Sequence, residues 1–422
     1  MLRRCKGWDY QQPCIYQITL VLADRQSQAL GGLKLPLLAP HFGLPPQAQN
    51  QPPQAQNQPH GSVPAAEAAG AMALAAASAI ALTPAGEAVK REFWALGEHH
   101  PEIKPLEIAV MPDHIHFIIR VLRPMAKPLG NAIGGFKAGS SKAAIGTGGL
   151  WAEGFQDTIL FHEGQLEAMF NYLRDNARRL AVKRLMPDLF RVRRNLKLPL
   201  QAQNQPLQAT HLKLPPQAQN QPPGSVPKAE AFGHFSAIGN HFLLESPNLL
   251  QVQCSRDYLA YRRIPKPGGG FKIARNEKGE PIIEKITPEF KEKRDMLLAA
   301  AKHGAVLISP CISDGEREIA RLAFASGVRV IALRNMGFSP LYKPGGKLFD
   351  QTSNGKLLLL APAAWPYQTE EKPMTRFDAC ALNRIAQLIA GDGAAEINYK
   401  GMKPKDIDRL VREAVKGGPD GQ

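Results

Sequence analysis

The pattern of apolar and polar positions divides the chain into two differently patterned blocks. In the first block, alternating apolar residues predict strands and apolar residues at helical spacing predict amphipathic helices. The predicted strands lie at 15–23, near Ile80, within 106–122 and at 158–161, and the predicted helices at 86–96, 129–144 and 165–185. Short strands interleaved with separate helices are typical of an α+β domain with an antiparallel sheet. We therefore expect such a domain over residues 1–195.

The second block begins near Ser236 and has a different periodicity. Short, continuously apolar strands are predicted at 305–309, 328–333 and 357–361, with an amphipathic helix at 314–326. Strand, helix and strand at this spacing form a βαβ unit of a parallel, Rossmann-like sheet. The sequence thus predicts an α/β domain over 233–395, followed by a C-terminal tail at 396–422.

Two segments that resemble each other interrupt these patterns. LKLP begins at 33, 196 and 212, QAQNQP at 47, 54, 201 and 217, and GSVP at 61 and 224. Gln/Pro-rich tracts bury too little apolar surface to offset their ordering entropy, so we expect two disordered inserts, at about 33–80 and at 196–232. Their period is too irregular for a solenoid. Because the copies lie between unrelated, well-patterned segments, we favour one DNA repeat that entered the reading frame more than once.

Composition points to a polyanionic partner. The chain has 52 Lys and Arg against 37 Asp and Glu, a net charge of +15, which favours nucleic acid but also fits a generally basic soluble protein. Its five cysteines have no CxxC spacing, which argues against a zinc ribbon or disulfide framework and fits the cytoplasm. The longest apolar stretch, 71–82, is too short to span a bilayer, and no signal peptide is evident, so no membrane partner is expected.

Two histidines flank one isoleucine in the predicted strand that contains MPDHIHFIIR, residues 111–120. Because side chains alternate along a strand, His114 and His116 point the same way, about 7 Å apart, while Ile115 and Phe117 point into a core. Two imidazoles on one face can share a divalent cation. The alternative is an incidental pair of half-buried histidines.

The predicted helix at 165–185 carries Tyr172 and Asn176 at i and i+4, so they share a face. An asparagine carbonyl is an acceptable third ligand, beside two imidazoles, for Mg²⁺ or Mn²⁺. A tyrosine one turn away could attack a phosphodiester held on that cation and form a covalent protein–DNA link. A lone helical tyrosine can equally belong to the core or the surface.

A basic stripe begins beside Tyr172, where a phosphate backbone would need to lie. Its candidate DNA-binding residues are Arg174, Arg178, Arg179, Lys183 and Arg184, followed by Arg191, Arg193 and Arg194. A basic helix can also be simply a solvated face.

Four segments in this order, MPDHIHFIIRV, GNAIGGFKAGSSKA, LWAEGF and YLRDNARR, resemble the single-tyrosine HUH transposases of small bacterial insertion sequences, especially their REP-associated relatives. The resemblance covers roughly residues 8–194 without the first insert and implies a ferredoxin-like HUH fold. It also implies that His114, His116 and Asn176 hold a metal and that Tyr172 is the nucleophile. The implied reaction is cleavage and rejoining of single-stranded or hairpin DNA through a 5′-phosphotyrosine and a free 3′-OH, in an enzyme of which many members work as homodimers.

Recognition of that DNA would involve the basic helices and loops, with Lys137 and Lys142 as contributors. Trp151 and Phe155 would either stack on bases or belong to the core. The chain departs from the family at Ala177, where relatives commonly have proline, and in the insert after Gly32. That insert keeps open the alternative of a non-catalytic DNA-binding protein derived from such an enzyme.

The second block weakly resembles the Rossmann-like domain of DNA-processing protein A over the segment HGAVLISPCISDGEREIARLAFASGVRVIALRNMGF. The turn after its first strand is where such folds bind ligands, because the N–H groups of a helix N-terminus favour anions. The candidate ligand loop comprises Ser309, Ser313, Asp314 and Gly315, with Asp314 as the expected N-cap. No GxGxxG motif or P-loop is present, so nucleotide binding stands beside accessory DNA binding and a purely structural role.

Overall fold

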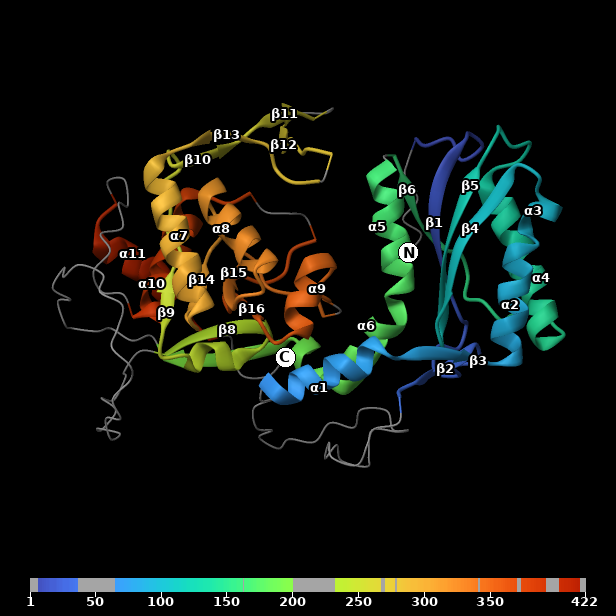
Figure 1. The fold of residues 1–422 in the computed structure, drawn as a ribbon, viewed down its shortest axis with the longest axis horizontal. Helices are drawn as coiled ribbons and strands as arrows, with labels where there is room; N and C mark the ends of the chain where they lie inside the picture. Colours follow the sequence, from blue (N-terminus) through green and yellow to red (C-terminus); the bar gives the residue numbers. More distant parts are fainter. Residues whose placement is uncertain are drawn as a thin grey trace. The chain divides into compact units, whose positions relative to one another are not determined.

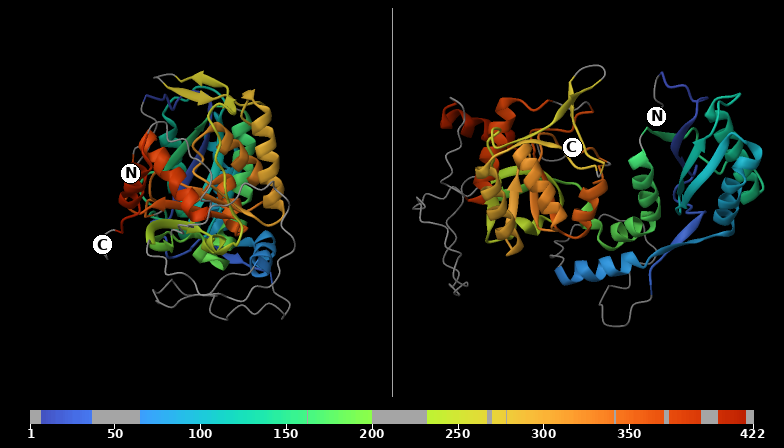
Figure 2. Two further views of the ribbon diagram at one scale, coloured as in Figure 1. Left: turned by 90° about the vertical axis from the view of Figure 1, so that its left-hand side faces the viewer. Right: turned by 45° about the horizontal axis from the view of Figure 1, so that its top comes forward.

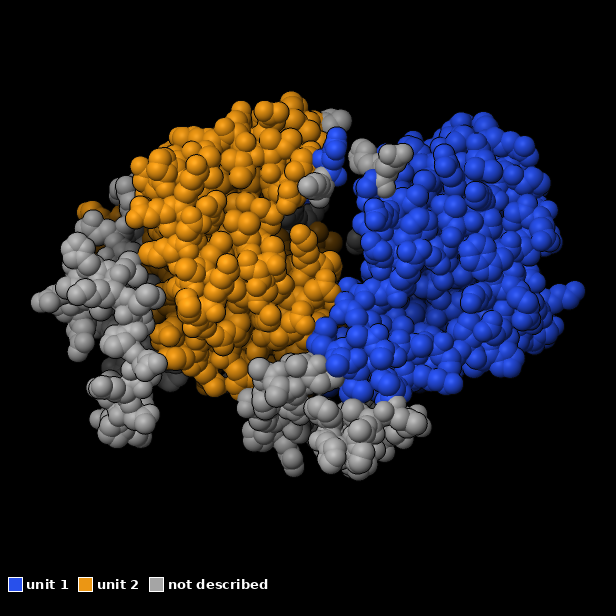
Figure 3. Space-filling view, in the orientation of Figure 1, with its two compact units in different colours: residues 1–58, 69–185, 277–279 blue, residues 59–68, 186–276, 280–422 orange. Residues whose placement is uncertain are grey.

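The computed structural model is a mixed α/β structure with several sheets. It describes residues 7–36, 65–161, 163–199, 232–266, 270–277, 279–340, 342–369, 373–391 and 402–417. The repeat-rich stretches 37–64 and 200–231, predicted to be disordered inserts, lie outside the described residues. The chain divides into two compact units, one of residues 1–58, 69–185 and 277–279 and the other of residues 59–68, 186–276 and 280–422 (Figure 3). Across the described residues, every helix falls short of the length and apolar character needed to cross a membrane.

The first unit is built on a four-stranded antiparallel sheet, as the sequence predicts. Its strands are β1 (Cys14–Val21), β4 (Ile103–Val110), β5 (His114–Val121) and β6 (Gln156–Leu160), in the spatial order β4-β5-β1-β6. The main helices between them are α2 (Pro84–Trp94), followed by the single turn α3 (Leu96–His99), and α4 (Leu129–Ile145). Along the chain this gives strand, helix, strand, strand, helix, strand, the split βαβ order.

Helices lie on both faces of this sheet, and the two faces differ in polarity. In β5, Ile115, Phe117 and Ile119 are fully buried in the core under α2 and α4, where Phe117 contacts Phe93 and Phe136 at ring-centroid distances of 5.3 and 5.5 Å. On the other side of the sheet lies α5 (Glu163–Arg174) (Figures 1 and 2). Because side chains alternate along a strand, residues of the opposite parity in β5 point toward that side. The helix α5 packs against β4 and β6, so it lies across this polar face.

The chain on either side of the first insert forms a pair of antiparallel strands. Strand β2 (Gly31–Lys34) pairs antiparallel with β3 (Ala79–Leu82), and the pairing brings Lys34 opposite Ala79. The alanine-rich stretch before β3 forms α1 (Ala65–Ala76), because alanine has the highest helix propensity. The predicted insert at about 33–80 was therefore too long at both ends, whereas the strand predicted near Ile80 is confirmed. Pairing of β2 with β3 holds the two ends of the insertion together.

The predicted helix at 165–185 is two helices, α5 and α6 (Asn176–Leu185), which meet at Asp175. The Asp175 carboxylate pairs with the guanidinium groups of Arg178 and Arg179 that follow it. The backbone bonds continue through the break, from Asp175 N to Asn171 O at 3.0 Å and from Arg179 N to Asp175 O at 2.9 Å. An aspartate whose side chain bonds to nearby residues favours a helix boundary over a helix interior. Because the backbone hydrogen bonds continue on both sides of Asp175, the interruption is confined to this residue.

The second unit is built on a six-stranded sheet in the order β7-β8-β16-β15-β14-β9. Strands β9 (Leu249–Gln251), β14 (Val306–Ser309), β15 (Val330–Leu333) and β16 (Leu357–Pro362) run parallel, and β8 (Phe232–Gly239) and β7 (Arg193–Pro199) extend the sheet antiparallel. The predicted strand-helix-strand unit is present as β14, α8 (Asp314–Ala325) and β15. Residues of β14 and β15 are buried throughout, because both faces of the sheet are covered.

Two helices cover each face of that sheet. On one side pack α7 (Pro288–Lys302) and α8, and on the other α10 (Arg376–Ala390) and α11 (Pro404–Ala414). The loop before β16 contains α9 (Gly346–Ser353). The remaining short elements are the pairs β10 (Leu259–Tyr261) with β13 (Ile283–Ile286) and β11 (Arg263–Pro265) with β12 (Phe271–Ile273), and the single turns η2 (Pro187–Phe190) and η3 (His241–Glu245).

The second unit begins before the predicted domain boundary at 195 and continues beyond the predicted end of the Rossmann-like domain at 395. Its residues start at Met186, before the expected boundary at 195. Strand β7 runs to Pro199, within the segment assigned to the second insert, and pairs with β8 on the far side of it. Helix α11 packs on α10, although the sequence placed it in a tail. Both inserts therefore leave from the end of an antiparallel strand pair.

Candidate metal and tyrosine site

The two histidines of β5 lie side by side on the polar face of the first sheet. The ring centroids of His114 and His116 are 4.8 Å apart and the ring planes are inclined by 78°. Both side chains are half-buried, whereas Ile115 between them is completely buried on the other face. Strand alternation thus places the pair as the sequence predicts.

A carboxylate fixes the orientation of the first histidine. His114 Nδ1 lies 2.6 Å from Asp113 Oδ1, and Arg25 contacts the same carboxylate at 3.1 Å. Burial raises the pKa of Asp113, but the hydrogen bonds and charges of His114 and Arg25 outweigh it and hold that pKa at about 2. An ionised carboxylate only accepts hydrogen bonds, so His114 Nδ1 carries the proton and its Nε2 lone pair is left for another partner.

The second histidine is held by β1, the neighbouring strand, which places Thr19 opposite it. His116 Nδ1 lies 2.8 Å from Thr19 Oγ1 and 3.2 Å from Gln17 Nε2. Burial, and secondarily the neighbouring His114, lowers the pKa of His116 to about 3, so its ring is neutral at physiological pH. A neutral imidazole is the form that binds metals.

The hydrogen bonds at Nδ1 decide which nitrogen of His116 is available. The Thr19 hydroxyl can donate or accept, so it suits either tautomer. The Gln17 amide presents its nitrogen to Nδ1, which places the ring proton on Nε2. Turning that amide by 180° presents its oxygen instead, moves the proton to Nδ1 and frees Nε2.

Tyr172 of α5 completes a cluster with this pair. Its ring lies edge-on to His116 at a centroid distance of 5.6 Å, and the guanidinium carbon of Arg179 lies 5.4 Å from its ring centroid. The packing of α5 across the polar face brings together residues that the chain separates widely. The histidine pair and the tyrosine predicted from sequence are therefore neighbours.

Asn176 begins α6 and is 7% exposed, so it is buried rather than facing solvent. Its Nδ2 atom has no hydrogen-bond partner among the described residues. Buried polar groups nearly always have a partner, and an amide nitrogen donates, so this group is suited to an acceptor that the described residues do not supply, such as a phosphate oxygen or a water. No three His, Cys, Asp or Glu side chains converge anywhere in the described part of the chain. A cation at the histidine pair would thus need a ligand of another type, and an asparagine oxygen is one.

The basic residues that the sequence suggests for DNA binding differ in how many hydrogen bonds and ion pairs their side chains already form within the protein. Lys137 Nζ donates to the carbonyl oxygens of Ala152 and Gly154 at 2.7 and 3.1 Å, which ties α4 to the loop before β6. Arg174 pairs with Glu107 at 3.2 Å, and Arg184 donates to Gln28 at 3.2 Å. The side chains of Arg178 and Arg179 share Asp175, Lys183 is half-buried on α6, and Lys142 is exposed near the end of α4.

The aromatic candidates belong to the core. Trp151 and Phe155 are 7% and 8% exposed, and both pack in the apolar cluster under the first sheet. The Trp151 indole donates to Ser140 Oγ at 2.9 Å. Of the two alternatives that the sequence left open, the structure favours the core.

The ligand loop proposed in the second unit is filled by the protein's own carboxylate. The N-cap of α8 is Ser313, not Asp314 as expected, and Ser313 forms a capping box with Glu316. The Glu316 carboxylate accepts from the backbone N–H groups of Ile312 and Cys254 at 2.7 and 3.4 Å, and burial raises its pKa. A bound phosphate would need these same donors.

The remaining side chains of this loop are also engaged. Ser309 Oγ accepts from Cys311 N at 3.0 Å, and Asp314 Oδ2 accepts from Tyr261 N at 3.0 Å and pairs with Arg263 at 2.7 Å. Gly315 lies at the start of α8, close under Cys254 and Phe290. The spacing Ser-x-x-Glu at 313–316 is the sequence signature of a capping box, and it would have predicted Ser313, not Asp314, as the N-cap.

Sequence reasoning also missed the residues that orient the histidines. These are Asp113 and Arg25, in loops, and Thr19 and Gln17, within β1, and none of them belongs to a distinctive motif. Only the cross-strand register identifies Thr19 and Gln17 as partners of His116.

No protein-family model and no curated protein matches the sequence. Among solved structures, the chain has a similarity to a REP-associated tyrosine transposase bound to a REP hairpin, with a TM-score of 0.24 and 13% identity. The alignment covers 41% of this chain and 71% of that one. A similarity of this size establishes neither the fold nor the activity of the present chain.

Proposed function

We propose that this protein cleaves and rejoins single-stranded DNA through Tyr172, as a member or descendant of the single-tyrosine HUH transposases. The observation that supports this most strongly is the contiguous cluster of His114, His116 and Tyr172 on the polar face of the first sheet. The split βαβ order of that sheet is that of the ferredoxin-like fold, and the second unit is in our interpretation Rossmann-like.

The chain's own residues fit a hard divalent cation. His114 and His116 through Nε2 and Asn176 through its amide oxygen would hold Mg²⁺ or Mn²⁺. Asp113 engages Nδ1 of His114, and Thr19 engages Nδ1 of His116, whose Nε2 is free once the Gln17 amide presents its oxygen to the ring. Histidines that bind metals through Nε2 have this pattern. Such an ion, when bound, would polarise the scissile phosphate and offset negative charge in the transition state.

Tyr172 supplies the nucleophile in this proposal. Its phenolic oxygen forms a bond to phosphorus and loses its proton to solvent, while the bond from phosphorus to the 3′-oxygen breaks. The 3′-oxygen leaves with a proton as a free hydroxyl, and the 5′-phosphate stays on the tyrosine. In the rejoining step a 3′-hydroxyl attacks the phosphotyrosine and restores the phosphodiester and the phenol.

Arg179 supports this role because it lies against the Tyr172 ring. A cation there favours negative charge on the reacting groups. Of the other candidates for DNA contact, Lys142 is exposed, whereas Lys137 has its amine engaged by two carbonyl oxygens. The DNA contacts are therefore assigned first to Lys142. The arginines of α5 and α6 are the second group, and a phosphate would have to replace or share their present partners, Glu107, Asp175 and Gln28.

The decisive experiment is trapping of the covalent adduct. Full-length protein is incubated with a pool of single-stranded oligonucleotides labelled at the 3′ end, in the presence of Mn²⁺, and separated under denaturing conditions. We expect a labelled adduct with the wild type and with Tyr367→Phe, which alters an exposed tyrosine of the second unit. Tyr172→Phe should abolish it, and an adduct that persists in this variant excludes Tyr172 as the nucleophile.

The rival function is non-catalytic DNA binding. It predicts that no adduct forms and that single-strand binding is indifferent both to Mg²⁺ and to His114→Ala. Fluorescence anisotropy with the same oligonucleotides, with and without Mg²⁺, distinguishes the two functions.

A further inference from the structure

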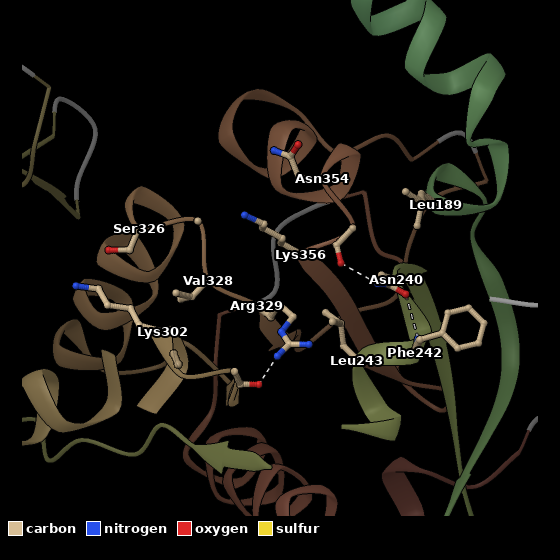
Figure 4. A pocket seen from close by; sticks show the side chains of 14 residues that line it. Leu189, Asn240, Phe242, Leu243, Lys302, Ser326, Val328, Arg329, Asn354 and Lys356 are labelled. Carbon is tan, nitrogen blue, oxygen red and sulfur yellow. Dashed lines mark hydrogen bonds between the residues drawn. The ribbon is translucent and has the colours of Figure 1, made fainter. Parts of the chain in front are cut away.

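A pocket of about 580 Å³ lies in the second unit, on the edge of the sheet where β15 and β16 begin. The loops that line it come from the end of α7, from the turn between α8 and β15 and from the turn between α9 and β16 (Figure 4). The loop at 310–315 instead follows Ser309, the last residue of β14, so it lies at the opposite end of these parallel strands. The pocket is thus separate from the ligand loop that the sequence suggested.

The charged side chains lining this pocket are all cationic. Lys302, Arg329 and Lys356 line it from three different segments, and no Asp or Glu is among its lining residues. The Arg329 guanidinium donates to the carbonyl oxygen of Gly304. Within the described residues, the side-chain amines of Lys302 and Lys356 form no hydrogen bond or ion pair.

Helix dipoles account for only part of this charge. Helices α7, α8 and α9 all end beside the pocket, and each C-terminus carries roughly half a negative charge. Three such ends amount to about 1.5 negative charges against three cationic side chains. The lysines without partners therefore leave an excess of positive charge around the cavity.

The rest of the lining combines an apolar wall with neutral polar groups. Phe242, Leu243 and Leu189 lie on one side of the pocket, and Lys302 and Ser326 lie on the other (Figure 4). Asn240 is fixed on the apolar side by its bond to Gly355 O at 2.8 Å, and Asn354 lies near Lys356. Concave sites of this volume, mostly apolar with a few convergent polar groups, are typical of small-molecule binding.

We propose that this pocket binds a nucleotide, with the phosphate between Lys302, Arg329 and Lys356 and the base against Phe242. Lysine and arginine are the usual phosphate ligands, and an aromatic ring offers a face on which any base can stack. The nucleotide can be free or the end of a DNA strand. This site is independent of Tyr172.

The test uses full-length protein and two fluorescent probes, an ADP analogue labelled on the ribose and a 5′-phosphorylated single-stranded 12-mer. We expect saturable binding of at least one probe, with inorganic pyrophosphate competing. Because charge-assisted contacts are lost, Lys302→Gln with Lys356→Gln should raise Kd about tenfold or more. Lys347→Gln, an exposed lysine of α9 outside the pocket, is the matched control and should leave Kd unchanged.

Each outcome decides the proposal. Loss of ADP binding in the double variant identifies a free nucleotide, and loss of only 12-mer binding identifies a strand end. Binding of neither probe at about 1 mM, or equal binding by the double variant and Lys347→Gln, overturns the proposal. Phe242→Leu, which keeps the charges, should weaken the ADP probe but not pyrophosphate. Tyr172→Phe should leave all of these values unchanged, so failure of the DNA-cleavage proposal is measured separately.

Discussion

The ring of His116 lies edge-on to the ring of Tyr172, with the two centroids 5.6 Å apart. His116 belongs to a strand and Tyr172 to a helix that crosses the same sheet face. This contact places a phenol beside a neutral imidazole whose neighbour, His114, is oriented by Asp113. Substitutions of its candidate ligands and of Thr19 test whether the cluster works as a cation site.

Removal of either imidazole should weaken Mn²⁺ binding. We expect His114→Ala and His116→Ala to lower the affinity at least tenfold, because each removes a ligand, and Asn176→Ala to lower it as well. The measurement is a titration of full-length protein with Mn²⁺ followed by electron paramagnetic resonance. His99→Ala removes an exposed histidine of the same unit and serves as control. Equal affinity in all four variants would contradict the assigned ligands.

Thr19→Val should act on the same site through His116. The substitution keeps the shape of the side chain but removes the group 2.8 Å from His116 Nδ1, so the ring loses an anchor. Loss of such an outer partner typically lowers metal affinity about tenfold to a hundredfold. Nitrogen chemical shifts of His116 should report a changed tautomer balance even without metal. Thr158→Val, on the exposed part of β6, should change neither quantity.

Substitutions at Lys137 and Lys142 should affect different properties of the protein: the first its stability and the second its binding of DNA. Lys137→Met removes two hydrogen bonds to carbonyl oxygens and should lower the free energy of unfolding by about 1–3 kcal/mol. The exposed Lys142→Gln should change it by less than about 0.5 kcal/mol but weaken single-strand binding. Urea unfolding and anisotropy check the two effects. A Lys137→Met protein of unchanged stability would show that the tether contributes nothing.

Glu316 should make the second unit less stable at higher pH. Burial raises its pKa above the ordinary 4.5, so the folded state holds the proton more tightly than the unfolded state. Its favourable contribution is therefore complete below pH 4.5 and is lost as the pH rises through the raised pKa. In Glu316→Gln the amide side chain carries no titratable proton, so this contribution to stability should not change with pH.

The comparison is the free energy of unfolding of wild type and Glu316→Gln from about pH 4 to about pH 8. The transition that contains α8 is identified by hydrogen exchange of its amides. We expect the wild type to lose stability relative to the variant as the pH rises. A difference that stays constant, or that changes in the opposite sense, would contradict a raised pKa.

Much of the architecture follows from local pattern. Alternation in MPDHIHFIIR was enough to place His114 and His116 on one face, because strand geometry leaves only two faces to choose from. The short, continuously apolar strands β14 and β15 with a helix between them indicated a parallel sheet, and the parallel pairing agrees. The alanine-rich α1 lies within the range predicted to be a disordered insert, although alanine has the highest helix propensity.

Other features depend on contacts between distant segments, which a single sequence does not specify. The pairing of β1 with β5 makes Thr19 a partner of His116, and the buried Glu316 replaces a ligand in the loop that the sequence suggested. The sequence by itself determined which residue types could hold a cation and attack a phosphate. Only the tertiary structure decided that Tyr172 lies against His116, because that depends on how α5 packs across the sheet.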